Sequence, residues 1–260
     1  IGYEIPSYTG GETYYTPLFD SLANAGVQFP NTYATPLCSP SRFELLSGLY
    51  NNYNYRDPAN YDTNYITVAK LLRKYGYNTC VSGKWQLGGG DASIKAMGFN
   101  AYCVLNAFTN DSAESVRYIN PLIYKNGKYV ADSLTKGKYS EDIFLNYINQ
   151  FTDTSTNPFF IYWAPLLVHP PFQPPPTHPD FATWGDGRQP LPGDTVYYPY
   201  MVSYLETLIQ KLITNLQTKK LYRNTKIIFL GDNGTYEGIT NKYRGMYVPG
   251  GKGKPTYFGM

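Results

Sequence analysis

The chain has few of the side chains that most often carry out acid–base or nucleophilic chemistry. Its 260 residues include two histidines, His169 and His178, and three cysteines, Cys38, Cys80 and Cys103. An odd number of cysteines without paired spacing argues against a disulfide framework and against a zinc site built from thiolates. Any reaction that this protein performs must therefore use few such groups.

Blocks of like charge and long apolar runs are also missing. The formal net charge is +3, from 22 Lys and Arg against 19 Asp and Glu. This pattern does not indicate nucleic acid or a membrane surface as a partner, although a mild positive balance suits an anionic substrate. No apolar stretch approaches the length that spans a bilayer, and the first residues, IGYEIPSYTGG, lack the basic start and apolar core of a signal peptide.

Helical and strand patterns alternate along the chain. Residues 66–76 show a helical apolar face with Gly76 as the C-cap, and residues 77–82 follow as a buried strand that ends at Gly83 and Lys84. Residues 159–163 predict a second strand, which leads into a loop carrying His169. Residues 201–216 predict a helix, followed by a strand at 226–230 that breaks at GDNG.

This alternation predicts an α/β fold with a largely parallel central sheet sandwiched between helices. Ligands of such sheets bind beyond the carboxyl ends of the strands. Lys84, His169 and Asp232 each follow a predicted strand, so we expect them at one edge of the sheet. Residues 180–200 are expected to form a long surface loop, and residues 111–137 a polar insertion with a hairpin around KNGK.

Taken singly, the candidate site residues have ordinary explanations. In CSPSR, Cys38 on its own is more readily a small buried thiol at a helix start than a nucleophile. Asp-Asn-Gly at 232–234 is a common turn sequence, and a lone loop histidine is as often structural as catalytic. A single lysine is usually a solvated surface residue.

Five segments together resemble the formylglycine-dependent sulfatases of the alkaline-phosphatase-like superfamily. In chain order they are TPLFDSLANAGVQFPNTYATPLCSPSRFELLSGLY, TVAKLLRKYGYNTCVSGKWQLG, PFFIYWAPLLVHPPF, LYRNTKIIFLGDNG and GGKGKPTY. One C-x-P-x-R match would be weak, but five ordered matches cover nearly the whole chain. The resemblance implies that residues 1–260 form a sulfatase catalytic domain. Because the family's metal-binding aspartate pair would precede Ile1, and its smaller C-terminal subdomain has no counterpart here, we expect a domain shortened at both ends.

The resemblance also implies roles for individual residues. Cys38 would be oxidised to formylglycine by a formylglycine-generating enzyme, and the hydrated aldehyde would be the nucleophile that attacks sulfur. Arg42 would hold this diol, while Lys84 and Lys252 would contact the sulfate oxygens. His169 would protonate the leaving alcohol, a role suited to a side chain that titrates near neutral pH.

A divalent cation belongs to the same expectation. Asp232, Asn233 and the modified Cys38 would bind calcium, with magnesium as the alternative, because such hard cations prefer oxygen ligands. One position departs from the family pattern: Gln86 stands where the family usually has a histidine that helps deprotonate the diol during sulfate release. A glutamine cannot accept a proton at neutral pH, so we expect an altered release step.

Three functions remain open on these residues. The first is hydrolysis of a sulfate ester, plausibly on a carbohydrate, by a protein that the family resemblance places in the periplasm or outside the cell. The second is hydrolysis of a phosphonate or phosphate monoester by the same machinery. The third is a non-catalytic sulfoglycan-binding relative in which Gln86 marks lost turnover, since fold alone does not certify activity. His178 matches no motif and is expected on the loop surface.

Overall fold

The computed structural model describes residues 1–54, 62–105, 107–108, 117–184, 195–256 and 258–259. The chain divides into two compact units. Unit 1 comprises Ile1–Ser41, Val168–Thr177 and Leu191–Met260, and unit 2 comprises Arg42–Leu167 and His178–Pro190. Among the helices of the described ranges, none combines the length and the apolar character that crossing a membrane requires.

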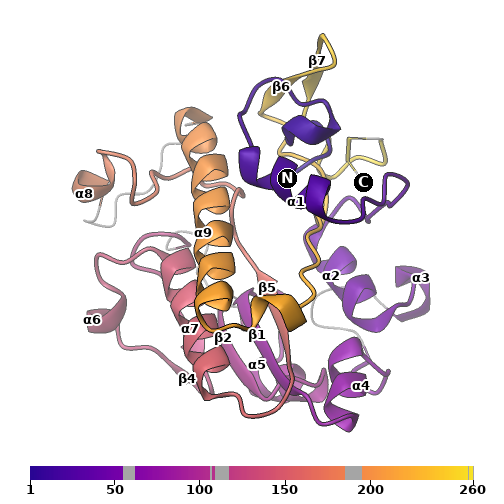
Figure 1. Ribbon diagram of the computed structural model, residues 1–260, viewed down its shortest axis with the longest axis vertical. Coiled ribbons are helices and arrows are strands. Elements are labelled where there is room, and N and C mark those ends of the chain that lie inside the picture. Colours follow the sequence, from indigo (N-terminus) through magenta and orange to yellow (C-terminus); the bar gives the residue numbers. More distant parts are fainter. Residues whose placement is uncertain (55–61, 106, 109–116, 185–194, 257, 260) are drawn as a thin grey trace. The chain divides into compact units, whose positions relative to one another are not determined.

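Unit 2 is built on a five-stranded sheet in the order β4-β3-β2-β1-β5, seen at the lower part of Figure 1. The strands are β1 (Asn78–Lys84), β2 (Ala101–Leu105), β3 (Tyr124–Lys125), β4 (Lys128–Tyr129) and β5 (Phe159–Ala164). β1 runs parallel to both β2 and β5, whereas β3 and β4 form an antiparallel hairpin on β2. The predicted α/β fold is therefore confirmed, and so is the hairpin around KNGK.

The carboxyl ends of the parallel strands lie together. Lys84 pairs with Leu105, the last residue of β2, and Gly83 pairs with Ala164, the last residue of β5. A Cβ atom on Gly83 would lie 2.1 Å from the carbonyl oxygen of Ala164, and the residue has a φ of +109°. Only glycine allows β1 to approach β5 this closely at position 83. The next residue, Lys84, ends β1 and therefore lies at the edge of the sheet.

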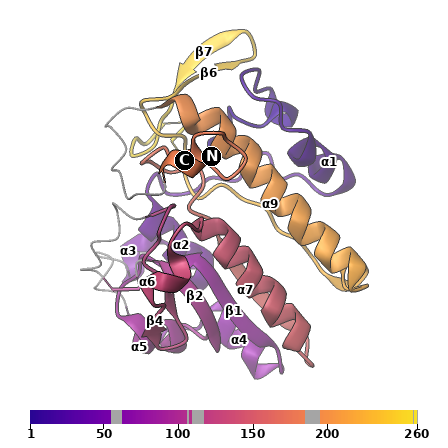
Figure 2. The same ribbon diagram turned by 90° about the vertical axis from the view of Figure 1, so that its left-hand side faces the viewer.

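Helices cover both faces of this sheet. The helices that belong wholly or in part to unit 2, among the residues described, are α2 (Cys38–Ser47), α3 (Asn51–Asn54), α4 (Val68–Lys74), α5 (Gly90–Ala96), α6 (Asp132–Thr135), α7 (Ser140–Thr154) and α8 (Phe181–Trp184). The hydroxyl of Ser82 donates to the carbonyl oxygen of Phe144 on α7 at 3.1 Å. Because neighbouring strand residues point to opposite faces, Val81 faces away from α7. Figure 2 shows α7 lying along the strands.

The face that Val81 joins carries the core of unit 2. Phe99 lies at its centre, fully buried, with ring centroids at 6.1 Å from Trp85, 6.2 Å from Phe160 and 6.4 Å from Tyr162. The buried members of this cluster are Phe43, Leu46, Ala69, Val81, Trp85, Leu87, Ile94, Met97, Phe99, Tyr102, Val104, Ala107 and Tyr124. The cluster joins the sheet to α2, α4 and α5.

The helix predicted at 66–76 is confirmed as α4, but its apolar face is narrower than expected. The Thr67 side chain accepts a hydrogen bond from the Lys70 backbone N–H, which caps the N-terminus. Ala69 is fully buried, whereas Ile66 is 71% exposed and Leu71 is 47% exposed. Gly76 follows the observed C-cap, Tyr75, with a φ of +83°. The pattern located the helix correctly and assigned too many residues to the core.

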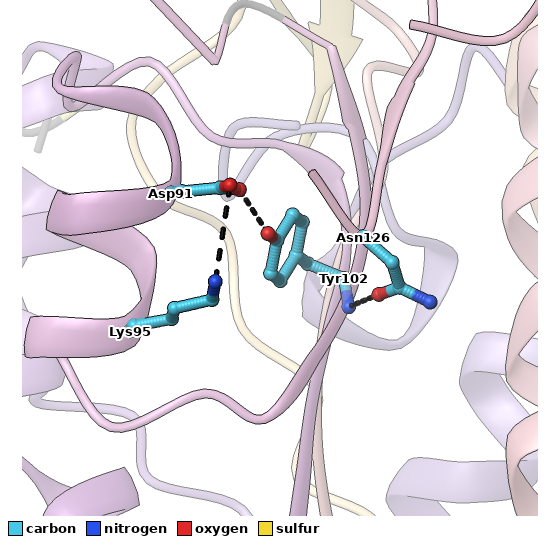
Figure 3. Close-up of polar contacts among 4 residues, drawn as sticks. All are labelled: Asp91, Lys95, Tyr102 and Asn126. Atoms are coloured by element: carbon cyan, nitrogen blue, oxygen red, sulfur yellow. Dashed lines mark hydrogen bonds and ion pairs between the residues drawn. The ribbon is translucent and has the colours of Figure 1, made fainter. Parts of the chain in front are cut away.

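A polar network fastens the β3–β4 hairpin to β2 and α5 (Figure 3). The Tyr102 hydroxyl donates to the Asp91 carboxylate, and Asp91 also pairs with Lys95 at 3.8 Å. The backbone N–H of Tyr102 donates to the side-chain oxygen of Asn126 at 2.9 Å, and Tyr147 on α7 donates to the same oxygen. Burial and the hydrogen bond to Asp91 raise the pKa of Tyr102, so the network is stable as a neutral phenol with its acceptor.

Unit 1 contains two α-helices, α1 (Pro17–Ala25) and α9 (Tyr198–Thr218), and an antiparallel hairpin of β6 (Thr240–Tyr243) and β7 (Met246–Pro249), among the residues described. Short 3-10 turns lie at Ser7–Thr9, Thr195–Tyr197 and Tyr222–Asn224. The helix predicted at 201–216 is confirmed and is longer at both ends. Its buried face includes Val202, Leu205, Leu208, Ile209, Ile213 and Leu216.

The N-terminus of α1 is capped from a distant part of unit 1. Its local cap residue, Thr16, makes no side-chain capping bond. Instead, the Oε1 atom of Glu206 on α9 accepts the backbone N–H groups of Leu18 at 2.9 Å and Phe19 at 3.0 Å. One carboxylate thus satisfies two of the backbone donors that a helix start leaves without an intrahelical partner.

Replacing this carboxylate is expected to destabilise the protein. Glu206→Ala leaves two N–H groups, one of them buried, without their acceptor, so we expect a loss of about 1–2 kcal/mol in the free energy of unfolding. Glu206→Gln keeps an acceptor oxygen and is expected to lose less. Urea denaturation measures both, with Ser203→Ala on the exposed side of the same helix as the control. An equal effect of the control would contradict the capping role.

Two expectations about unit 1 and the long loop were wrong. Residues 226–230 form no strand and are largely exposed, with Ile228 at 81%. An apolar extended segment becomes a strand only where another strand pairs with its backbone, and the sequence pattern does not report pairing. The supposed surface loop at 180–200 contains α8 and the start of α9, while residues 185–194 lie outside the described ranges.

Candidate active site

The motif CSPSR begins helix α2. Cys38 is its first residue, and Pro40 falls in the first turn, where a missing backbone N–H has no intrahelical partner to lose. Ser41 fixes this start: its backbone N–H donates to Leu37 O and its hydroxyl to Thr35 O. Arg42 follows Cys38 by four residues and therefore lies on the same side of the helix. The chain passes from unit 1 to unit 2 between Ser41 and Arg42.

In unit 1 two polar side chains from the C-terminal part of the sequence lie against the Cys38 sulfur. The ammonium group of Lys252 donates to Sγ at 3.3 Å, and the thiol donates to Oδ1 of Asn233 at 3.5 Å. Cys38 is 8% exposed and Asn233 is 5% exposed. The sulfur therefore sits at a helix start, next to a fixed cation and a buried amide oxygen, and both the helix dipole and Lys252 favour negative charge here.

The loop that carries Lys252 is fixed by backbone bonds on two sides. The N–H of Lys252 donates to Thr235 O at 2.9 Å, and the N–H of Gly253 donates to Pro36 O at 2.9 Å. A Cβ atom on Gly250 would lie 2.1 Å from Tyr236 O, so only glycine allows the loop to approach this segment. The glycine-rich sequence GGKGK thus has a physical purpose: it brings a lysine close to Cys38.

Asp232 and Asn233 present hard oxygen donors beside Cys38. The Asn233 side-chain N–H donates to Oδ1 of Asp232, which leaves its own Oδ1 directed at the sulfur. The backbone N–H of Gly2 donates to the hydroxyl of Thr235 at 3.0 Å, so the first residues of the chain lie beside this segment. Carboxylate and amide oxygens of this kind suit calcium or magnesium. Among the described residues, no three His, Cys, Asp or Glu side chains form a cluster able to hold a metal ion.

His169 belongs to unit 1 and follows β5 in the sequence. Its ring Nδ1 lies 2.6 Å from the carbonyl oxygen of Pro170. A carbonyl oxygen can only accept, so the ring proton on this side resides on Nδ1. In the neutral ring Nε2 then carries no proton, so donation from Nε2 requires the doubly protonated imidazolium.

In unit 2 the cationic residues Arg42 and Lys84 are both buried and are joined by a hydrogen bond. Arg42 is 4% exposed and Lys84 is 2% exposed. The Nη1 atom of Arg42 donates to the backbone oxygen of Lys84 at 2.8 Å and to the Tyr162 hydroxyl at 3.4 Å. Arg42 is therefore fixed to the backbone at the carboxyl end of β1, next to a buried lysine, and both side chains have the charge that an anionic ligand requires.

Gln86 lies in the turn that follows β1. Its φ is 51°, in the left-handed region, and its side chain is partly buried. Neighbouring Trp85 stabilises the turn, since its indole N–H donates to Gly88 O at 3.0 Å. Histidine is among the non-glycine residues enriched in this backbone conformation, so the turn accommodates either side chain.

Of the three residues expected just past strand ends, Lys84 is the last residue of β1, which runs parallel to β5. The expectation is wrong for Asp232, because the segment before it is not a strand. His178 is not on an open surface: its side chain is 14% exposed and its Nδ1 accepts the Asp180 backbone N–H at 3.2 Å within a local turn.

Glu141 is one of several buried ionisable residues that no sequence motif indicated. Glu141 in the first turn of α7 is fully buried, and burial raises its pKa to about 8, against the lowering effects of the Leu166 and Leu167 N–H groups and of Arg42. An acidic residue in the first turn of a helix is ordinary, so the sequence contains no signal that this one faces inward.

Comparisons with known proteins agree on one family. The family model described as "Sulfatase" matches residues 2–257. Arylsulfatase J of Mus musculus is 28% identical over 90% of this chain and 41% of its own length. The N-acetylgalactosamine-6-O-sulfatase of Bacteroides thetaiotaomicron is 29% identical, with 84% and 54% covered. The chain thus spans about half the length of these curated relatives.

Solved structures share the fold. The crystal structure of Ps i-CgsB in complex with k-i-k-neocarrahexaose superposes with a TM-score of 0.73 over 90% of this chain and 56% of that one, at 24% identity. The phosphonate monoester hydrolase of Agrobacterium radiobacter superposes with a TM-score of 0.58 at 18% identity, covering 85% of this chain and 58% of that one. At these identities the likeness concerns the fold alone.

Proposed function

Because the chain belongs to the Sulfatase family, we propose that it takes part in hydrolysing a sulfate ester with a nucleophile derived from Cys38. The observation that carries this proposal is the position of the Cys38 sulfur. It lies at the start of α2, 3.3 Å from the Lys252 ammonium and 3.5 Å from Asn233 Oδ1. A buried thiol with only a packing role has no need of a cation and an amide directed at it.

Each further residue of the proposed site has a physical task. Formylglycine at position 38, once hydrated, supplies the hydroxyl that attacks sulfur. Lys252 and Lys84 compensate the negative charge of the sulfate and of the developing leaving oxygen. Arg42, fixed by its bond to the Lys84 carbonyl, orients the nucleophile. His169, as an imidazolium whose Nδ1–H donates to Pro170 O, delivers its Nε2 proton to the leaving alcohol and becomes neutral.

We propose that Asp232 and Asn233, together with the modified Cys38, hold a calcium ion, with magnesium as the alternative. Their donor chemistry fits, because both supply hard oxygens and Asn233 Oδ1 is already directed at position 38. Bound there, the cation polarises the sulfate oxygens and favours the ionised nucleophile. These three residues supply fewer oxygens than the six to eight that calcium takes, so they account for part of the coordination shell.

The proposed substrate is a sulfated saccharide. Several relatives are named as N-acetylgalactosamine or N-acetylglucosamine 6-sulfatases. One superposing structure, at 28% identity and a TM-score of 0.56, is described as a complex with D-glucosamine-2-N,6-O-disulfate. The proposal includes a formylglycine-generating enzyme as the maturation partner. Since sulfated glycans are met mainly outside the cytoplasm, it also includes a periplasmic or secreted location.

The experiment that tests the proposal is the mass of the proteolytic peptide containing Cys38. The full-length protein is co-expressed with a formylglycine-generating enzyme, and a known sulfatase serves as the positive control. An aldehyde mass and release of sulfate from aryl or sugar sulfates support the proposal. An unmodified thiol, with the control converted, contradicts it and favours a sulfoglycan-binding protein. Parallel assays on aryl phosphate and phosphonate esters identify the alternative monoester hydrolase.

Gln86 is expected to limit the release of sulfate. Gln86→His supplies a proton acceptor at a backbone position that tolerates it, so kcat for 4-nitrophenyl sulfate is expected to rise about tenfold. The parent protein is expected to show a burst of nitrophenol that the variant lacks, which rapid-mixing kinetics measures. Gln86→Asn, which retains an amide, is the matched control. An unchanged kcat in Gln86→His would show that release is not limited at this residue.

A further inference from the structure

The backbone of Leu166, two residues after β5, is held by buried side chains through both its N–H and its carbonyl oxygen. Its N–H donates to Oε1 of Glu141 at 2.6 Å, and its carbonyl oxygen accepts from the Tyr118 hydroxyl at 2.8 Å. The next N–H, that of Leu167, donates to the same carboxylate oxygen at 3.3 Å. Two side chains from other parts of unit 2 therefore fix the direction in which the chain leaves β5.

The two holding residues are themselves connected. The backbone N–H of Ser140 donates to Tyr118 O at 2.7 Å, and the rings of Tyr118 and Tyr139 stack with centroids 5.5 Å apart. Glu141 and Tyr118 are both fully buried. A contact made by groups that cannot rotate into solvent restricts the loop more than one made by exposed side chains.

Burying a carboxyl group costs desolvation free energy, and Glu141 could avoid this cost by facing solvent. Glu141 lies in the first turn of α7, where a solvent-facing carboxylate would stabilise the helix without desolvation. It is instead turned inward, where Oε2 has no hydrogen-bond partner among the described residues and Arg42 supplies attractive charge. Helix stability does not account for this arrangement. Fixing the backbone that follows β5 does account for it.

Glu206 makes a similar contact to a segment that leads to no proposed site residue. It also accepts two successive backbone N–H groups through one oxygen, and there the result is a capped helix. The segment held by Glu141 starts no helix. Two residues after Leu167 the chain reaches His169, the proposed proton donor.

We propose that Glu141 is a positioning residue that fixes the backbone of Leu166 and thereby the loop that carries His169. Tyr118 binds the carbonyl oxygen of the same residue. This inference rests on the proposed function, because its consequence for turnover requires that His169 protonate the leaving group. A loop held less firmly would deliver that proton less often while leaving the attack on sulfur intact.

The first test compares two substrates in the full-length, formylglycine-containing protein. Loss of leaving-group protonation affects phenyl sulfate, whose leaving group is the more basic, more than 4-nitrophenyl sulfate. Glu141→Ala is expected to lower kcat/KM about tenfold more on phenyl sulfate than on 4-nitrophenyl sulfate, and the same is expected of His169→Ala. The double variant is expected to be no worse than His169→Ala alone. Glu206→Ala, the matched control, is expected to affect both substrates equally.

A conservative variant separates positioning from simple loss of stability. Glu141→Gln retains an oxygen that can accept both N–H groups, and it is expected to recover most of the activity on phenyl sulfate. Equal losses on the two substrates in Glu141→Ala would overturn the proposal, and so would a Glu141→Gln variant as impaired as Glu141→Ala.

A second readout does not depend on activity. Hydrogen exchange followed by mass spectrometry is expected to show faster exchange in peptides covering residues 160–170 for both Glu141→Ala and Tyr118→Phe, with little change in α9. Unchanged exchange would overturn the inference. If the parent hydrolyses no sulfate ester, the proposed function has failed, and the exchange measurement still decides whether Glu141 holds the loop.

Discussion

Lys252→Ala is expected to lower kcat/KM for 4-nitrophenyl sulfate by about 10²- to 10³-fold, the usual cost of removing one charge-stabilising group from an active site. The Lys252 ammonium lies 3.3 Å from the Cys38 sulfur, so its removal takes away the cation nearest to the proposed nucleophile in unit 1. Steady-state kinetics on the formylglycine-containing protein measures the effect, with the Cys38 peptide mass confirming equal modification of parent and variant.

Lys254 is the matched control for this prediction. It lies two residues further along the same glycine-rich loop, more than half exposed, and pairs with Glu237 at 3.3 Å. Exposed ion pairs of this kind contribute little, so Lys254→Ala is expected to leave kcat/KM within about twofold. Equal losses in the two variants would mean that net positive charge, and not the position of Lys252, supports turnover. A Lys252→Ala variant with unchanged kcat/KM would contradict its proposed role.

Phe99→Ala is expected to have the largest effect on stability, a loss of about 3–5 kcal/mol in the free energy of unfolding. Phe99 is fully buried and lies against Trp85 and two β5 aromatics, Phe160 and Tyr162, so truncation loses its transfer free energy and leaves a cavity between the sheet and its helices. Because Tyr162 also accepts a hydrogen bond from Arg42, this cavity would loosen the site in unit 2 as well.

Chemical denaturation with urea measures the loss, and Tyr75→Ala is the control. Tyr75 lies at the end of α4 in the same unit, 71% exposed, so its truncation is expected to change stability by no more than about 0.5 kcal/mol. A Phe99→Ala loss as small as that of the control would mean that the aromatic cluster rearranges to fill the space. It would also show that the position of β5 does not depend on this ring.

Glu141 and Glu206 show how similar contacts can serve different purposes. In each, one buried carboxylate oxygen accepts two successive backbone N–H groups. Glu206 caps helix α1, whose own cap residue Thr16 makes no side-chain capping bond. We propose that Glu141 instead fixes a loop that precedes the proposed catalytic residue His169. The difference lies in the segment that is held, which no property of the two glutamates reveals.

The sequence by itself determined the elements whose pattern depends on near neighbours. The apolar periodicity of 201–216 and the short buried strands at 77–82 and 159–163 are local, and each was found in the structure close to its predicted place. The parallel arrangement of β1 and β5 followed from helix-strand alternation. The motifs around Cys38 and Asp232 identified the family because they are chemically specific over short stretches.

The tertiary structure alone decided which of these residues meet. Lys252 and Cys38 are 214 positions apart, and Asn233 and Cys38 are 195 apart, so no local pattern could report their contact. For the same reason the sequence could not show that residues 226–230 lack a strand partner or that Glu141 faces inward. Pairing and burial are properties of the whole fold, because they depend on which distant surfaces exclude water together.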